Sequence, residues 1–163
     1  MRHRFFYICF ILLSFNMSTF SQNIKEKDDI SRVLKEFIDN KKAINYCNKL
    51  PSFKAIDNNG DSINGIVYIL NSDCSFCVVS FLDFYLSLKN TQIHLYALIE
   101  EGNIPVVKYY MEKIGIKSYS NLQFIENIDK RIFDGNTEDY SGVVLYYSDN
   151  KLKYSILYNS ISQ

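Results

Sequence analysis

The stretch that decides the fold is Asn71-Ser72-Asp73-Cys74-Ser75-Phe76-Cys77. An apolar run at residues 65–70 comes before it, and residues 78–86 repeat apolar side chains at helical spacing after it. This pattern predicts a strand, a short turn with two cysteines three residues apart, and a helix. At the helix start, free backbone N–H groups and the positive end of the helix dipole can stabilise a thiolate on Cys74. Cys77 lies one helical turn further and is near enough to form a disulfide with Cys74, so the stretch indicates a redox site.

Two strands are predicted on either side of the helix that follows this turn. Residues 65–70 and 92–99 are nearly continuous apolar runs, as is typical of strands buried on both faces. With the helix at residues 74–89 between them, they form a strand–helix–strand unit whose strands should be parallel and connected in the right-handed sense. A second helix is predicted at residues 104–114, with Gly115 ending it.

Turn residues and periodicity predict the remaining elements. Residues 122–125 form a short strand, and residues 143–147 and 151–157 form an antiparallel hairpin. An Asn59-Gly60 turn joins two extended segments. Near the N-terminus, residues 24–43 are predicted to form an amphipathic helix, because five apolar side chains recur there at helical spacing: Ile30, Val33, Leu34, Phe37 and Ile38.

Composition limits the classes of protein to consider. The 163 residues are enough for one domain with a hydrophobic core. Hydrophobic residues make up 47% of the chain and charged residues 22%, which is typical of a globular protein. Eighteen basic residues cancel eighteen acidic ones. The charge therefore implies no nucleic-acid partner.

The first residues are typical of a targeting segment. Arg2 and Arg4 precede an apolar run at residues 5–15, and small and polar residues follow. The apolar run is too short for a comfortable membrane span. We expect a signal peptide over residues 1–21, cleaved after Ser21, with no stable membrane insertion afterwards. An uncleaved N-terminal anchor is the alternative.

Cleavage would leave three cysteines in a compartment where disulfides persist, which we expect to be the periplasm or cell envelope. It removes Cys9 and two basic residues, so the mature chain has 16 basic and 18 acidic residues, a formal charge of −2. The spacing makes Cys74 and Cys77 the natural pair. Cys47 is then either a half-buried small apolar residue in a connector, a third redox partner, or an intermolecular thiol.

With these features the chain resembles the thioredoxin superfamily, and most closely its secreted bacterial branch of TlpA/ResA-like thiol-disulfide oxidoreductases. The resemblance covers roughly residues 50–157. It rests on Pro51-Ser52-Phe53, on the strand, Cys74-Ser75-Phe76-Cys77 and helix, on the β-α-β order, and on the closing hairpin. It implies an α/β three-layer sandwich with a mixed central sheet and helices on its faces. It also implies that Cys74 is the attacking thiol and Cys77 the resolving thiol.

Several family features are replaced in this chain. The cis-proline that precedes the closing hairpin is replaced by Ser141-Gly142, and the two positions where members hold a buried acid are Tyr68 and Ser80. Asp73 replaces a tryptophan, where it could cap the helix but would oppose a thiolate on Cys74 by its charge. The family's C-terminal helix is missing, since only residues 158–163 follow the hairpin. We expect the extra N-terminal helix to cover part of the sheet face left open.

The predicted organisation is a signal peptide at residues 1–21, an N-terminal amphipathic helix and connector at 22–49, and a thioredoxin-like domain at 50–163. The predicted function is thiol-disulfide exchange through Cys74 and Cys77 with protein thiols or disulfides of the cell envelope. The alternative is a non-catalytic binding module in which these two cysteines form a structural disulfide.

Other chemistry has little support in the sequence. Two thiolates suit a soft metal, but neither a second Cys-x-x-Cys nor a suitably placed histidine accompanies them, so no metal and no cofactor are predicted. His94 is expected to be a packed residue in the middle of a strand. It has no serine or cysteine partner at a recognisable spacing, which leaves hydrolase chemistry unsupported.

Overall fold

The computed structural model describes residues 30–57, 59–88 and 91–158. The chain divides into two compact units, Met1–Glu36 and Phe37–Gln163. Residues 30–39 are helical, which confirms part of the helix predicted at residues 24–43. The predicted signal peptide and the residues that follow the hairpin lie outside the described residues.

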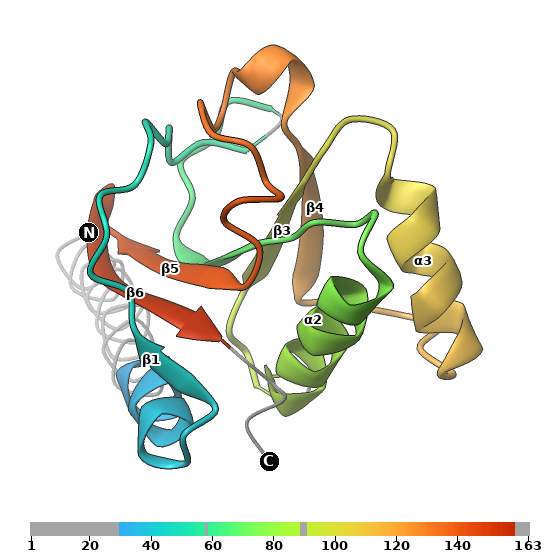
Figure 1. The fold of residues 1–163 in the computed structure, drawn as a ribbon, viewed down its shortest axis with the longest axis horizontal. Coiled ribbons are helices and arrows are strands. Elements are labelled where there is room, and N and C mark those ends of the chain that lie inside the picture. The colour runs from blue at the N-terminus through green and yellow to red at the C-terminus, as the bar shows by residue number, and fades with distance from the viewer. Residues whose placement is uncertain (1–29, 58, 89–90, 159–163) are drawn as a thin grey trace, which may run out of the picture. The chain divides into compact units, whose positions relative to one another are not determined.

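A mixed sheet of six strands holds the second unit together, in the order β1-β6-β5-β2-β3-β4 (Figure 1). Every residue of β2 is buried, and β2 pairs with β3 in parallel and with β5 in antiparallel orientation. The parallel pair and the closing hairpin were both predicted and are confirmed. The strands are β1 Ala43–Asn45, β2 Gly65–Ile69, β3 Leu95–Ile99, β4 Leu122–Glu126, β5 Val143–Ser148 and β6 Lys151–Tyr158.

Strand β1 was not predicted. It falls within residues 22–49, where we expected a helix and a connector, and it pairs antiparallel with β6 through Ala43 and Tyr158. Its three residues show no clear alternation of apolar and polar side chains, so nothing local marks them as a strand. The free edge of β6 decides their conformation, and the sheet therefore extends to residues before position 50.

Two helices follow the strands as predicted, α2 at Ser75–Leu88 and α3 at Ile104–Lys113. A proline stands in the first turn of α3, where its missing N–H is tolerated. Gly115 follows α3 with φ +82° and donates its N–H to the carbonyl of Glu112 at 3.0 Å. This left-handed glycine ends the helix as expected.

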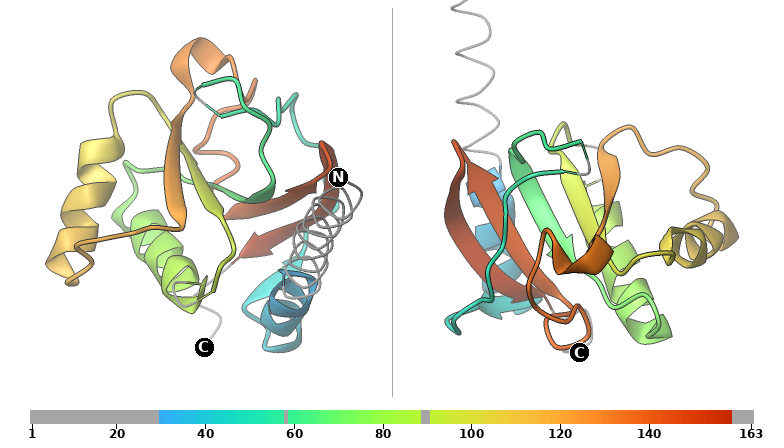
Figure 2. Two further views of the ribbon diagram at one scale, coloured as in Figure 1. Left: turned by 180° about the vertical axis from the view of Figure 1, so that it is seen from behind. Right: turned by 90° about the horizontal axis from the view of Figure 1, so that it is seen from above.

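Both helices pack on one face of the sheet. Tyr68 of β2 meets Phe81 of α2 with ring centroids 5.3 Å apart, and Lys108 of α3 lies 6.0 Å from the ring centroid of Phe124 in β4. Tyr68 and Phe124 are both cross-strand partners of Ala97, so their side chains share a face. Figure 2 shows the two helices from two further sides.

Mostly irregular segments, with the short 3₁₀ helix η1 (Ile128–Lys130), cover the opposite face. Residues 46–57, 59–63 and 127–142 lie over it and bond to each other, with the Lys54 N–H donating to the Ile132 carbonyl at 2.8 Å. The predicted mixed α/β sheet is confirmed, but α2 and α3 share one face, whereas we expected helices on both. The core on this side consists of Ile63, Val67, Ile69, Leu98, Ile125, Ile132, Phe133, Val143, Leu145 and Tyr147.

Phe37, near the end of the predicted N-terminal helix, packs against α2 and β6. Phe37 contacts Phe84 of α2 at 5.2 Å and Tyr158 of β6 at 5.3 Å between ring centroids. Phe84 lies against the same Tyr68 ring as Phe81 does. Phe37 thus packs on the face of the sheet that α2 also occupies.

The two predicted turns are confirmed. Gly60 has φ +86°, and the Asp57 carboxylate accepts the N–H of Asp61 at 2.9 Å across that turn. At the tip of the β5–β6 hairpin, Asp149 and Asn150 have φ of 56° and 58°. Positive φ at both central residues is the geometry that suits the twist of a two-residue hairpin.

Replacing Phe133 by alanine tests whether the irregular segments hold the second face. Phe133 is fully buried between Phe53 and Tyr140. We expect Phe133→Ala to lower the free energy of unfolding by about 3–5 kcal/mol, measured by urea titration. Ile128→Ala, from the same segment but 38% exposed, should stay within about 0.5 kcal/mol of the parent. Similar losses in the two variants would contradict this packing.

Candidate functional site

Cys74 is the N-cap residue of α2, which begins at Ser75. Its carbonyl accepts the Val78 N–H at 3.0 Å, and its sulfur accepts the Cys77 N–H at 3.2 Å. The sulfur thereby takes the place that a serine or aspartate oxygen takes at most helix starts. The N–H group and the helix dipole both favour a negatively charged sulfur at this point. The predicted junction of strand, cysteine turn and helix is confirmed.

Asp73 does not cap the helix, contrary to one expectation. Its carboxylate accepts a hydrogen bond from the Asn103 side chain at 3.3 Å, just before α3. Its N–H donates to the Asn71 side-chain oxygen at 3.0 Å, which closes the turn before Cys74. The exposed Asp73 carboxylate is turned to a neighbouring loop because the cap position one residue later belongs to Cys74.

Cys77 differs from Cys74 in its surroundings, although both are half-buried. Burial raises the pKa of the Cys77 thiol above its usual range, and the neighbouring Cys74 side chain raises it further. Ser141, which lines the same cavity, acts in the opposite direction and lowers this pKa. Cys77 therefore keeps its proton, while its backbone N–H donates to the Cys74 sulfur. This difference suits Cys74 as the first nucleophile.

A cavity of about 210 Å³ opens beside Cys77. It lies between β2, the start of α2, the residues before β5 and the end of β6. Four hydroxyl groups and three less polar residues line it with Cys77: Tyr68, Ser80, Ser141, Tyr158, Phe76, Gly142 and Leu157. The resolving thiol of the predicted pair thus faces a space with several neutral polar groups.

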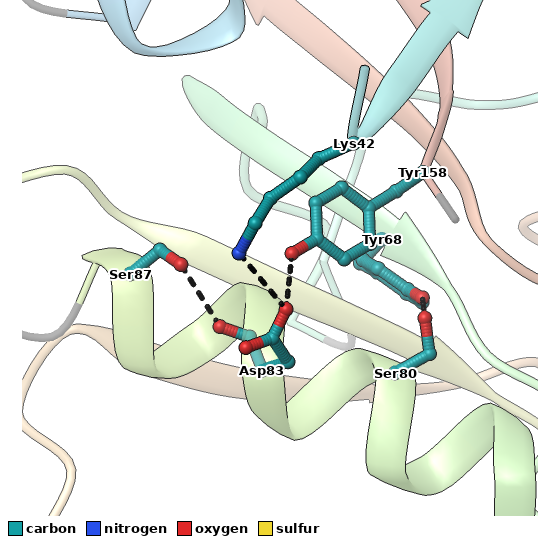
Figure 3. Close-up of polar contacts among 6 residues, drawn as sticks. All are labelled: Lys42, Tyr68, Ser80, Asp83, Ser87 and Tyr158. Atoms are coloured by element: carbon teal, nitrogen blue, oxygen red, sulfur yellow. Dashed lines mark hydrogen bonds and ion pairs between the residues drawn. The ribbon is translucent and has the colours of Figure 1, made fainter. Parts of the chain in front are cut away.

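Tyr68 and Ser80, the two positions at which the sequence resemblance led us to look for a buried acid, meet in this cavity. The Tyr68 hydroxyl donates to Ser80 Oγ at 3.5 Å (Figure 3). Burial raises the pKa of Tyr68, and the nearby Ser80 only partly offsets this effect. Tyr68 is therefore neutral, and two uncharged hydroxyls stand where a carboxylate was possible.

A second polar cluster, which the sequence did not indicate, joins β6 to α2. The Tyr158 hydroxyl donates to Asp83 Oδ2 at 2.6 Å, and Lys42 Nζ lies 3.5 Å from the same oxygen (Figure 3). Burial and the Asp83 carboxylate raise the pKa of Tyr158, so its proton stays in place. Asp83 looks like an ordinary polar residue of an amphipathic helix in the sequence. Its partners come from residues far along the chain.

Ser141 and Gly142 connect the strands around the cavity. The Gly142 N–H donates to the Ile69 carbonyl at 2.9 Å, and the Gly142 carbonyl accepts the Tyr158 N–H at 2.8 Å. Ser141 Oγ accepts the Asn71 N–H at 3.1 Å. Ser141 and Gly142 are therefore bound to the end of β2 and to the end of β6.

Cys47 and His94 are not part of this site. Cys47 is exposed, so the half-buried position expected for it is wrong. It lies two residues after the end of β1 and does not line the cavity beside Cys77. His94 is exposed and precedes β3, so the packed position expected in mid-strand is also wrong.

Comparison of the chain with protein-family models, with curated proteins and with solved structures finds no match. Among the described residues, no three His, Cys, Asp or Glu side chains gather closely enough to hold a metal ion. No helix in the described ranges is both long and apolar enough to cross a membrane. The fold is a mixed α/β sheet, and the site is a pair of free thiols at a strand–helix junction.

Replacing Gly142 tests whether its close approach to the backbone of Tyr158 contributes to stability. Its φ is +87°, and a Cβ there would lie 2.9 Å from the Tyr158 carbonyl oxygen, while Gly60 has φ +86° with open space around it. Gly60→Ala should cost about 1–2 kcal/mol of stability from backbone strain alone. Gly142→Ala should cost clearly more in the same urea titration, because a backbone oxygen must also move. Equal losses would mean that the contact with Tyr158 is unimportant.

Proposed function

We propose that this chain is an exported, thioredoxin-like thiol-disulfide oxidoreductase, in which Cys74 is the attacking thiol and Cys77 the resolving thiol. One observation carries the proposal: the Cys74 sulfur accepts the Cys77 N–H at 3.2 Å at the start of α2. A sulfur held in this way is stabilised as the thiolate, which is the reactive form in disulfide exchange. The raised pKa of Cys77 supports the division of roles, since the second thiol stays protonated until it is needed.

The reaction would proceed in two exchanges. The Cys74 thiolate attacks one sulfur of a partner disulfide, a mixed disulfide forms, and the partner's second sulfur leaves with the electron pair and takes up a proton. Cys77 then loses its proton and attacks the Cys74 sulfur. A Cys74–Cys77 disulfide forms, and the partner's first sulfur leaves as a thiolate. The pair loses two electrons and the partner disulfide gains them; the reverse sequence oxidises a partner dithiol.

The fold supports a thioredoxin-like assignment in its central part. The strand β2, the cysteine turn, α2 and the parallel strand β3 follow in the expected order, and β5 and β6 close the sheet as an antiparallel hairpin. The position of α3 on the same face as α2 departs from the layers expected for the family. The proposal therefore depends on the site more than on the complete topology.

Export and partners are proposed from the sequence. The charged, apolar and small-residue regions of residues 1–21 favour a signal peptide, which would deliver the chain to the periplasm or cell envelope. The partners would be protein thiols or disulfides there. A non-catalytic module with a structural Cys74–Cys77 disulfide is the competing function, and the half-buried state of both cysteines is compatible with it.

The reduction potential of the Cys74–Cys77 couple separates these two functions. We expect equilibration with glutathione or dithiothreitol at about −120 to −270 mV, the range of known oxidoreductases, together with reduction of insulin. Cys47→Ser should leave the value unchanged, because Cys47 is exposed and does not line the cavity beside Cys77. A potential well below about −300 mV, with no insulin reduction, would contradict the oxidoreductase and favour a structural Cys74–Cys77 disulfide.

Trapping of partners tests the roles of the two thiols. Cys77→Ser should accumulate mixed disulfides with cell-envelope proteins, because the thiol that releases them is gone. Cys74→Ser, the matched variant, should accumulate almost none, since burial raises the pKa of the Cys77 thiol and keeps it protonated. The adducts are counted on non-reducing gels and identified by mass spectrometry. Equal trapping by the two variants would contradict the assignment.

A further inference from the structure

The carboxyl ends of three parallel strands meet at the edge of the sheet where Cys74 lies. The segments that follow β2, β3 and β4 are residues 70–74, 100–103 and 127–142. Together with Glu126, the last residue of β4, they hold eight acidic residues and two basic ones. The acidic residues are Asp73, Glu100, Glu101, Glu126, Asp129, Asp134, Glu138 and Asp139, and the basic ones are Lys130 and Arg131. We call this edge the thiol edge.

Two carboxylates of the thiol edge are bound to the short loop before α3. The Asp73 carboxylate accepts a hydrogen bond from the Asn103 side chain at 3.3 Å, and the Glu126 carboxylate accepts the Gly102 N–H at 2.9 Å. Amide donors hold a carboxylate in place without cancelling its charge. Asp73 directly precedes Cys74 in the chain, and Glu126 stands two strands away from β2, at about 4.8 Å for each step. Both charges therefore lie within reach of a partner that docks on Cys74.

Glu100, the residue after β3, is bound in the same way. Its carboxylate accepts the Thr137 hydroxyl at 3.0 Å and the Thr137 N–H at 3.3 Å. Within the described part of the chain, none of the three carboxylates on Asp73, Glu100 and Glu126 forms an ion pair with a basic side chain. Arg131, one of the two basic residues of the thiol edge, pairs instead with its own neighbour Asp129 at 3.3 Å. The three carboxylates thus keep an uncompensated negative charge.

The other groups around the thiols do not offset this charge. Phe76 and Val79, on the outer side of α2, are uncharged and about half exposed. The cavity beside Cys77 is lined by hydroxyls and apolar groups. Lys42 lies 3.5 Å from the Asp83 carboxylate, which compensates it.

The helix dipoles oppose the carboxylates only at short range. The N-termini of α2 and α3 each carry about half a positive charge, and its effect fades within the first turn. It favours the thiolate on Cys74, together with the Cys77 N–H. Two half charges are fewer than the full charges of Asp73, Glu100 and Glu126, which act over about a Debye length of 8–10 Å. A partner that approaches the thiol edge therefore meets a negative potential.

We infer that the thiol pair selects disulfides flanked by positive charge, so that its partner carries Lys or Arg beside the cysteine that Cys74 attacks. This inference rests on the proposed function and adds the class of substrate. A negative potential raises the local concentration of a basic partner and speeds the encounter, while it repels an acidic partner. Charges at the rim of an interface act mainly on the rate of association and on its salt dependence. The thiol chemistry itself is the same for both kinds of partner.

The test compares three small disulfides that differ in charge. Cystamine has an ammonium group at each end, hydroxyethyl disulfide is neutral, and dithiodiglycolate has a carboxylate at each end. Each is mixed with the reduced full chain carrying Cys9→Ser and Cys47→Ser. The Cys74–Cys77 disulfide forms, and the small disulfide breaks into two thiols, which receive the two electrons and two protons that the pair gives up. Alkylation of the remaining thiols, followed by mass spectrometry, gives the rate.

Each rate is divided by the rate of the same disulfide with dithiothreitol, which removes its intrinsic reactivity and the effect of an attacking thiolate's own charge. At about 10 mM ionic strength, where the Debye length is about 30 Å, cystamine should react at least about fivefold faster than dithiodiglycolate on this scale. At about 1 M, where it is about 3 Å, the difference should fall below about twofold. Equal normalised rates at low ionic strength would overturn the inference. If all three disulfides, the neutral one included, left the pair reduced, the proposed function itself would be wrong.

Charge-removing variants locate the source of the preference. Asp73→Asn combined with Glu126→Gln keeps an oxygen for each neutral donor, and should reduce the preference for cystamine at low ionic strength by at least about twofold. The ratio of the two charged disulfides cancels any effect of Asp73 on Cys74 itself. An unchanged ratio in this double variant would contradict the inference.

Asp61→Asn is the matched control. It removes an exposed carboxylate from the turn before β2, where Asp61 donates its N–H to Asp57 and Asp57 accepts the side chain of Gln123 near the start of β4. This turn lies at the opposite end of the parallel strands, so the preference for cystamine should stay the same. A loss as large as that in the double variant would overturn the assignment to the thiol edge. The salt series on the parent needs no change at the thiol edge, so it decides the inference even where the double variant does not fold.

Discussion

The burial of β2 on both faces is the constraint on which the rest of the structure depends. All five of its residues are buried, with aromatic rings of α2 on one side and the irregular segments on the other. Its parallel ladder runs one residue past the strand, where the Leu70 N–H donates to Leu98 at 2.9 Å. The next N–H, of Asn71, turns to the Ser141 hydroxyl instead. The sheet thus ends where the cysteine turn begins, and this switch places Ser141 beside the site.

The electrostatics of the site come from hydrogen bonds more than from charges. The Cys74 sulfur is held by a backbone N–H, and the cavity beside Cys77 is lined by neutral hydroxyls. The nearby ion pair of Asp83 and Lys42 has side chains 38–43% exposed, so its own contribution to stability is about 0–1 kcal/mol. Its consequence for the site is orientation, because Asp83 fixes the Tyr158 hydroxyl and with it one wall of the cavity.

The face opposite α2 and α3 shows how a mostly irregular segment can cover a sheet. The buried Asn127 side chain bonds both the N–H and the carbonyl of Phe133 at 2.9 Å, so the segment closes on itself without regular structure. Phe133 then packs against Phe53 and Tyr140. Satisfying buried backbone groups with an amide side chain lets the loop carry a large aromatic residue into the core. The same segment ends at Ser141 and Gly142, which links core packing on this face to the thiol site.

The sequence by itself determined the elements that have local periodicity: β2, the cysteine turn, α2, β3, α3 and the β5–β6 hairpin. These follow from apolar spacing and turn residues that short-range sterics and hydrogen bonding fix. Only the tertiary structure decided that β1 joins β6, that both helices share a face, and that Ser141, 70 residues further along the chain, accepts the Asn71 N–H before the cysteine turn. A serine before a strand carries no sign of its distant partner. Its contact with Asn71 arises from the sheet order, which depends on how the whole chain buries its apolar surface.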